Sequence, residues 1–530
     1  MAKQPNRREA LRAAGGAALA AWSGAVAATT KAPAATTNKP RGLRVASLEF
    51  GVTPVEKSDT PYTGRFTGAV VRQVAGPLKT SVTLLEQGDL RVCLVASDFN
   101  SYTRANTSDA IRQAIAADLD LPVANVVLTS THNHSDVAVA SNAISAWADP
   151  PPEGFPKPEW LPAGKELLEK CRSHVKRLPE LLRPVTVWWA EGSEGRITYN
   201  RKGRRADGST YFMREEDRDL VGVDFNGDID RQAPIVVLKD ERGNSVTAIA
   251  QFTGHPVTCY HPEKPIVFGD WPRVACDRVA GHLAPSGALP VSFLQGCAAD
   301  VNSKGMFRGG VEESTRFGNM LGQSYIEALG NLRPSERGGF DYAVEKVGIP
   351  LAPLPPVETL RAEIAEMEAY IRRAAAGDED TLHCVGLNFP TELTPSYRGR
   401  LVERILPWNR WALGLHEGGR AGSAPEFQEV EIHIFRLGDV GIVGMPFEPF
   451  QGIGRQIRAR SPLPLAIPCG YTNVSYGYLT DGPNTGDREY MSAFYRYSEF
   501  RPPYRKPAGD VLADKTVEVF ARFLEQADDA

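Results

Sequence analysis

The chain has 530 residues, of which 42% are hydrophobic and 23% charged, and its formal net charge is -4 at pH 7. This length exceeds what one small core needs, so we expect one large domain or two. A weakly acidic chain with no basic block beyond its first residues is not typical of a nucleic-acid-binding protein, and the sequence after residue 40 has no apolar run long enough to predict a membrane span.

Residues 1–28 have the form of a twin-arginine export signal. Arg7 and Arg8 precede a mild Ala/Gly-rich stretch, and Ala25-Val26-Ala27 fits a cleavage site. An Ala-rich helix with a basic flank is the alternative. Residues 29–41, rich in Ala, Thr, Lys and Pro, have the composition of a disordered linker. We therefore expect a periplasmic or secreted protein whose folded domain spans residues 42–530.

Seven cysteines are spread along the chain without a C-x-x-C pair. Their odd number and spacing indicate neither a zinc ribbon nor a disulfide framework. Several lie inside apolar runs, as Cys93 does, so we expect buried free thiols.

Strand and helix patterns alternate from residue 43 onward. We predict strands at 43–50, 81–85 and 90–96, and a helix from a capping segment at 106–109 to about 118. A buried strand at 126–130 follows. The order strand, helix, strand predicts a right-handed parallel crossover.

Two histidines follow the strand at 126–130, in the segment Thr131-His132-Asn133-His134-Ser135-Asp136. Ligands of open α/β sheets bind at the carboxyl ends of the strands. Side chains alternate along an extended segment, so His132 and His134 point to the same side. Both could line one cavity, or one could bind a metal while the other carries a proton. The alternative is a pair of polar loop histidines.

Two further strands of the middle third also end in polar residues. A helix at about 159–178 and a strand at 185–189 come first. A hairpin at 234–238 and 246–252 then leads into His255, and Asp270 precedes a helix that reaches about residue 282. A strand at 290–294 leads into a segment with Asp300 and Asn302. Each aspartate could be a metal ligand or could cap a helix or loop.

The last third begins with an apparent insertion at about 357–420, either a lid or a packed excursion, with a helical stripe that starts at Leu360. A hairpin at 431–435 and 440–443 then leads to Glu448 at the start of another helix, and a tyrosine-rich loop at 469–478 and a closing helix at 510–525 follow. We predict an α/β fold of layered mixed β-sheets flanked by helices, with a metal site at the carboxyl ends of the strands.

The order of these segments resembles the neutral (alkaline, non-lysosomal) ceramidases over roughly residues 43 to 525. The matching motifs are Thr131-His132-Asn133-His134-Ser135, Gly254-His255-Pro256 with Gly269-Asp270, Gln295 to Asn302, Met445-Pro446-Phe447-Glu448, and Thr472 to Tyr478. Each motif is short, but five of them in the same order form a specific pattern.

The resemblance implies a single Zn2+ held by His132, His255, Glu448 and Tyr478. A zinc ion of this kind lowers the pKa of a bound water toward about 7. By the same resemblance, His134 either contacts a metal ligand without binding the metal or carries the proton for the departing amine. Two further positions that line the family's site, and that could polarise the amide carbonyl, are Arg201 and Tyr490. The resemblance therefore implies a metal-dependent amidohydrolase acting on a small-molecule or lipid amide such as ceramide.

The chain departs from the family pattern at several positions. Asn302, a candidate substrate-binding residue, replaces the family's serine, and Phe447 stands where the family has glycine before Glu448. The given sequence ends soon after the tyrosine motif, so we expect no counterpart of the family's C-terminal immunoglobulin-like domain within it. A mechanism that uses metal-activated water tolerates the Asn302 difference, whereas recognition of ceramide hydroxyls is more sensitive to it.

Two other classes of function stay open. One is a two-metal hydrolase of esters or phosphoesters that uses Asp98, Asp270 and Asp300 beside the histidines. The other is a catalytically degenerate binding protein on the same scaffold.

Overall fold

The structure, a computed structural model, describes residues 42–52, 63–64, 70–71, 73–102, 107–140, 159–204, 210–213, 215, 229–262, 264–285, 287–389, 391–498 and 500–528. The predicted export signal (1–28) and the whole of the predicted linker (29–41) lie outside these residues. None of the described helices is both long and apolar enough to cross a membrane.

A nine-stranded mixed sheet forms the centre of the domain. In spatial order its strands are β13 (Val291–Gln295), β11 (Ser245–Phe252), β10 (Gln232–Asp240), β6 (Arg183–Ser193), β1 (Arg44–Val52), β3 (Leu78–Gln87), β4 (Leu90–Ser97) and β5 (Val126–Ser130), and β15 (Arg333–Pro334) also pairs with β6. Helix α2 (Asp109–Leu119) connects β4 to β5, and these two strands are parallel. The predicted parallel pairing of two strands joined by a helix is therefore confirmed.

A second sheet has four strands: β16 (Phe340–Pro350), β19 (Phe427–Leu437), β20 (Val440–Gly444) and β22 (Leu465–Cys469). The predicted hairpin of β19 and β20 is antiparallel, and β20 pairs in parallel with β22 after helix α11 (Gln451–Arg460). Neither β16 nor β22 was predicted from the sequence.

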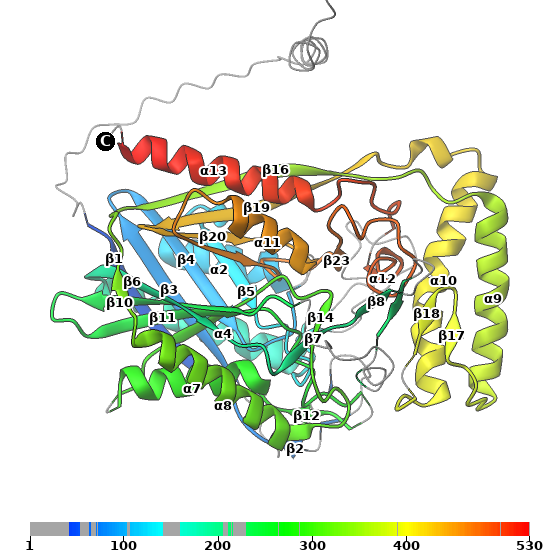
Figure 1. Ribbon diagram of the computed structural model, residues 1–530, viewed down its shortest axis with the longest axis horizontal. Helices are drawn as coiled ribbons and strands as arrows, with labels where there is room; N and C mark the ends of the chain where they lie inside the picture. The colour runs from blue at the N-terminus through cyan, green and yellow to red at the C-terminus, as the bar shows by residue number, and fades with distance from the viewer. Residues whose placement is uncertain are drawn as a thin grey trace, which may run out of the picture. The chain divides into compact units, whose positions relative to one another are not determined.

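The two sheets and their helices form four layers. Alternate side chains of the nine-stranded sheet point to opposite faces. Val127 and Val236 pack against Ile442 of the second sheet, whereas Leu128 packs with α2 and α4 (Pro162–Val175), and Val237 packs with α7 (Asp270–Leu283) and α8 (Gly310–Leu329). Helices α11 and α13 (Asp510–Asp528) cover the outer face of the four-stranded sheet. In Figure 1 α13 lies along that sheet, and α7 and α8 lie beyond the other one. This layered α/β fold confirms the predicted class.

The segment predicted as an insertion contains two long helices that pack side by side, α9 (Val357–Ala375) and α10 (Pro395–Glu417), as Figure 1 shows. Leu360 and Met367 of the predicted stripe are buried. Helix α10 was not predicted, because it contains Pro407 and lacks a clear apolar stripe.

Short elements complete the described fold. They are β2 (Gln73–Val74), β7 (Thr198–Asn200), β8 (Lys202–Arg204), β9 (Thr210–Phe212), β12 (Ile266–Val267), β14 (Val301–Ser303), β17 (His383–Cys384), β18 (Leu387–Asn388), β21 (Glu448–Pro449), β23 (Tyr478–Leu479), α5 (Leu178–Leu181), α12 (Tyr495–Ser498), and the 3-10 turns Val123–Asn125 and Ala421–Ser423. The helix expected at 159–178 is thus found as α4 followed by α5. All seven cysteines are buried and free, as predicted.

Candidate metal centre and active site

His132 and His134 meet at the end of β5. Their Nε2 atoms lie 3.2 Å apart, and their rings are nearly perpendicular with centroids 4.8 Å apart. His132 has a positive φ of 60°, so the segment leaves the extended conformation that the sequence analysis assumed. The two side chains nevertheless converge. Together with His255 they are the one group of His, Cys, Asp and Glu side chains in the described part of the chain whose ligand atoms all lie within 4.8 Å of one another.

His255 follows β11 and is fully buried. Its Nδ1 lies 2.7 Å from the carbonyl oxygen of Ala298, and Nδ1 of His132 lies 3.2 Å from the carbonyl oxygen of Asn100. A carbonyl oxygen only accepts hydrogen bonds, so each Nδ1 carries the proton of a neutral imidazole. The lone pair of each histidine is therefore on Nε2, the arrangement found in histidines that bind metals.

Glu448 brings a carboxylate oxygen to the same point. Its Oε2 lies 3.1 Å from Nε2 of His132 and 3.1 Å from Nε2 of His255. The two Nε2 atoms and Oε2 then point lone pairs at one another with no proton between them. A cation bound among the three atoms would remove this repulsion. Ligand atoms at the corners of a tetrahedral zinc site lie about 3.3 Å apart, so the donor set fits this ion.

Electrostatics keep His255 in the form that binds a metal. Burial is the main cause that lowers the pKa of His255 well below its ordinary value, and the guanidinium of Arg201 lowers it further. Nη2 of Arg201 lies 3.3 Å from Nε2 of this histidine. The imidazole is therefore neutral near pH 7.

Tyr478 reaches the site from the strand beside Glu448. The two residues are direct partners in the parallel ladder of β21 and β23. Nη2 of Arg201 donates to the Tyr478 hydroxyl at 2.8 Å. Burial raises the pKa of Tyr478 well above its ordinary value, and Arg201 partly offsets this increase. All four proposed ligands thus lie at one place.

The other predicted site residues surround this cluster. Arg201 also donates from Nη1 to Oδ1 of the buried Asn302 at 3.2 Å, and from Nε to the carbonyl oxygen of Ala299 at 2.9 Å. The ring of Tyr490 lies 5.7 Å from that of Tyr478, and burial raises the pKa of Tyr490 to about 12. His134 is only half-buried, so it is the histidine of the group that is nearest to solvent.

The three aspartates considered for a second metal lie outside the histidine group. Oδ2 of Asp98 accepts from the backbone N–H of Lys79 at 2.9 Å, and burial raises the pKa of Asp98 to about 7. Asp270 accepts from the backbone N–H groups of Trp271 at 2.7 Å and Cys259 at 3.2 Å. Oδ1 of Asp300 accepts from the N–H of Gln451 at 2.8 Å. These contacts fix loops that carry site residues, such as the segment after His255.

The sequence analysis assigned no role to Tyr471, which stacks on His132 with ring centroids 4.3 Å apart. It also missed the carbonyl oxygens of Asn100 and Ala298 that orient the two histidines. The tyrosine-rich loop was the only signal for Tyr471, because backbone carbonyls leave no trace in the pattern of side chains.

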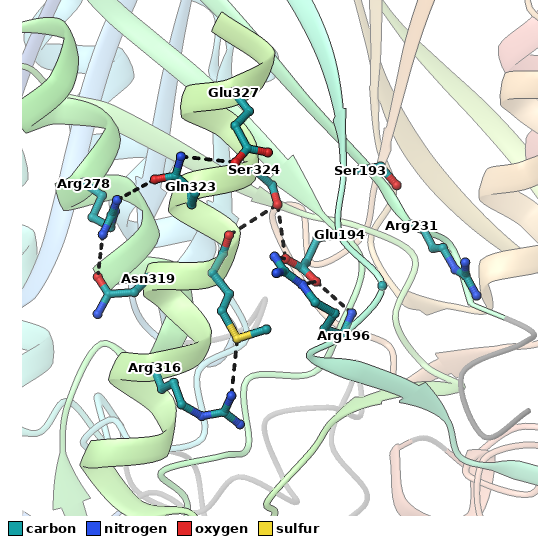
Figure 2. A pocket seen from close by; sticks show the side chains of 12 residues that line it. Ser193, Glu194, Arg196, Arg231, Arg278, Arg316, Asn319, Gln323, Ser324 and Glu327 are labelled. Carbon is teal, nitrogen blue, oxygen red and sulfur yellow. Dashed lines mark hydrogen bonds and ion pairs between the residues drawn. The ribbon is translucent and has the colours of Figure 1, made fainter. Parts of the chain in front are cut away.

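A cavity of about 860 Å³ lies elsewhere, between the end of β6 and helices α7 and α8 (Figure 2). Its charged groups largely bond one another. Glu194 accepts from the backbone N–H of Arg196 at 2.7 Å and from its Nε at 2.9 Å, and Arg278 donates to Asn319 at 3.3 Å and Gln323 at 2.9 Å. None of its lining residues belongs to the histidine cluster, so we do not place the active site there.

No family model matches the chain, and no curated protein matches its sequence. Its structure is similar to the crystal structure of neutral ceramidase from Pseudomonas aeruginosa, with a TM-score of 0.58 and 16% sequence identity over 91% of this chain and 75% of that chain. A second solved structure, a ceramidase complexed with C2, matches with a TM-score of 0.61 and 15% identity over 92% of this chain and 76% of that chain. The chain therefore has the neutral ceramidase fold that its motifs predicted.

Proposed function

We propose that this protein is a zinc-dependent amidohydrolase of the ceramidase type that uses water to cleave an N-acyl amide, either ceramide or a related amide lipid. The observation that carries this proposal is the convergence of Nε2 of His132, Nε2 of His255 and Oε2 of Glu448, with 3.1 Å from the carboxylate oxygen to each nitrogen. The fold and the ceramidase identity of the two similar structures support the same reaction class.

Zinc bound to these residues and Tyr478 would lower the pKa of a water molecule to about 7 and polarise the amide carbonyl. The protein's own groups complete the site. Arg201 holds the Tyr478 hydroxyl at 2.8 Å, and its guanidinium lies close enough to the cluster to stabilise negative charge on the carbonyl oxygen. Tyr490, beside Tyr478, is the second donor for that oxygen.

His134 is the proton carrier in this proposal. Its Nε2 lies 3.2 Å from His132, and it is half-buried, so it can exchange protons with solvent. It accepts the proton of the attacking water as the new C–O bond forms. It then gives that proton to the amide nitrogen as the C–N bond breaks, so that a carboxylic acid and an amine leave.

In this proposal the acyl chain of the substrate lies beside the aromatic residues around Tyr490. Phe212, Phe494 and Tyr497 all pack around Tyr490. Such a wall favours an acyl chain over a charged group. In this proposal Asn302 binds the polar part of the substrate, and its hydrogen bond from Nη1 of Arg201 to Oδ1 supports this role.

We also propose that residues 1–28 are removed as a twin-arginine signal and that the mature protein acts in the periplasm or outside the cell. Arg7 and Arg8, followed by the Ala/Gly-rich stretch, support this. N-terminal sequencing of the exported protein tests it: a mature chain that begins near residue 28 is expected, and an uncleaved protein in the cytoplasm would overturn it.

The decisive experiment combines metal analysis of the purified protein with fatty-acid release from ceramides and simple N-acyl amides. We expect one zinc ion per chain, loss of activity with a chelator and recovery with zinc. Two metal ions with phosphatase activity would instead support a two-metal ester hydrolase. Unchanged zinc content in His132→Ala, together with no amide cleavage, would indicate a degenerate binding protein.

A further inference from the structure

Tyr471 lies against the metal centre and has no role in the reaction described above. Its side chain is 1% exposed, and its ring stacks on the His132 imidazole with centroids 4.3 Å apart and an interplanar angle of 30°. The ring also meets His255 nearly edge-on at 6.4 Å. An aromatic ring packed flat on an imidazole restricts the rotation of that imidazole.

The loop that carries Tyr471 is clamped between the strands of the site. Its backbone N–H donates to the carbonyl oxygen of Phe447 at 2.7 Å, next to Glu448. Asn473 donates its N–H to Leu128 of β5 at 2.7 Å. Tyr471 itself has a φ of 56°, a conformation that a bulky residue rarely adopts and that persists where the surroundings impose it. The position of the ring is therefore fixed by the fold.

The Tyr471 hydroxyl is buried and has no hydrogen-bond partner among the described residues. Phenylalanine would fill the same space without leaving a buried donor unsatisfied. The charged and polar groups that act on this phenol are, in order, Glu448, Tyr478, Arg201 and Cys297, and the first three belong to the centre. A small molecule bound at those three groups would be the partner that this hydroxyl lacks among the described residues.

We propose that Tyr471 is a further residue of the reaction centre: its ring holds the plane of the His132 imidazole, and its hydroxyl donates a hydrogen bond to the attacking water. This inference rests on the proposed function. Once His134 has taken one proton, the oxygen would have three lone pairs: one would bind the metal, one would accept from the phenol, and the third would point toward the carbonyl carbon.

Two variants separate the two roles. Tyr471→Phe removes only the hydroxyl, and Tyr471→Leu also removes the ring. For Tyr471→Phe we expect zinc affinity, measured by competition with a chelator, to stay within about 3-fold, and kcat to fall about 10- to 100-fold, the range for one lost hydrogen bond to a charged group. For Tyr471→Leu we expect zinc affinity to fall at least about 10-fold, the size of a change in a residue that orients a ligand.

A readout other than activity comes from thermal unfolding with and without zinc. In the metal-free protein, Tyr471→Phe should raise the melting temperature, because an unsatisfied donor is removed. With zinc and its water bound, the gain should vanish or reverse. Tyr325→Phe is the matched control. Tyr325 lies on helix α8, and its buried hydroxyl donates to the carbonyl oxygen of Gln251 at 2.8 Å. Loss of this hydroxyl should lower stability equally in both forms and leave kcat unchanged.

An unchanged kcat in Tyr471→Phe, with equal shifts in melting temperature in both forms, would overturn the inference while the wild-type protein still binds zinc and cleaves amides. If the wild-type protein fails to bind zinc, the proposed function fails first and the inference with it. The wild-type measurement therefore tells the two failures apart.

Discussion

Glu448 and Tyr478 are direct partners in the short parallel ladder between β21 and β23, so a carboxylate and a phenol enter the candidate metal centre from neighbouring strands. The Glu448 N–H donates to the carbonyl oxygen of Gly477 at 2.9 Å, which fixes this register. His132 and His255 approach from the other sheet, after β5 and β11. The centre thus lies between the ends of β5 and β11 of the nine-stranded sheet and the two-stranded ladder of β21 and β23.

Replacing Glu448 by glutamine tests the carboxylate as a ligand. The amide keeps the shape of the side chain but loses the charge that faces both Nε2 atoms at 3.1 Å. We expect zinc affinity to fall by more than about 100-fold. This is a larger loss than is typical when the changed residue only orients a ligand. Chelator competition and metal analysis measure this, and fatty-acid release should disappear.

Glu489→Gln is the matched control for that experiment, because Glu489 is also fully buried but bonds Lys202 at 3.1 Å and Thr210 at 3.0 Å instead of the histidines. It should lower stability and leave zinc content unchanged. Full zinc occupancy in Glu448→Gln would contradict the ligand assignment.

His134→Ala tests the proton carrier. All four proposed ligands remain in place, so we expect one zinc ion per chain with KM nearly unchanged and kcat lower by about 100-fold or more, as is typical of a lost general acid or base. Added imidazole should restore part of the rate. Loss of both zinc and activity would instead identify His134 as a ligand. Its Nε2 lies 3.2 Å from Nε2 of His132, so it is close enough for that role.

Asn302→Ser tests the residue that departs from the ceramidase pattern. Asn302 donates from Nδ2 to Met306 at 3.2 Å and accepts from Arg201, so its side chain fills the space beside the guanidinium. A serine is shorter and can both donate and accept. We expect kcat/KM for ceramide to rise relative to that for simple N-acyl amides, with unchanged zinc content. An equal change for both substrates would exclude Asn302 from recognition of the ceramide hydroxyls.

His433 predicts how the stability of the metal-free protein depends on pH. This buried residue lies with Nδ1 2.6 Å from the Tyr342 hydroxyl and with Nε2 2.7 Å from Nδ2 of Asn473. Burial, with a smaller effect of Arg112, lowers the pKa of His433 to about 3. In the unfolded chain the pKa of histidine is about 6.5.

Well above pH 6.5 His433 is neutral in both the folded and the unfolded protein, so it does not lower the free energy of unfolding there. As the pH falls from about 6.5 toward 3, the unfolded chain binds a proton that the folded protein does not, so the free energy of unfolding falls by up to about 1.4 kcal/mol per pH unit for this group. In His433→Gln the slope of the unfolding free energy against pH should be smaller, because unfolding takes up about one proton fewer in this pH range. Urea unfolding at several pH values measures it, with the exposed His282→Gln as control; equal slopes for both variants would contradict the prediction.

The local pattern of the sequence predicted much of the fold. The apolar run at 126–130, the hairpin of β10 and β11, and helices α7 and α13 follow from the spacing of apolar residues and from turn residues close in sequence. Helix α8 was not predicted, because Gly318 and Gly322 interrupt its pattern. Both glycines serve tertiary packing: a Cβ at Gly318 would lie 2.4 Å from Val274 of α7.

The sequence by itself determined which chemical groups are present: the His132 and His134 pair, His255, Glu448 and the tyrosines, in the order of the ceramidase motifs. Only the tertiary structure decided that Oε2 of Glu448 lies within 3.1 Å of two imidazoles and that the Asn100 and Ala298 carbonyls orient them. The physical reason is that side-chain periodicity depends on neighbours in sequence, whereas a metal centre depends on strand pairing and packing between residues hundreds of positions apart.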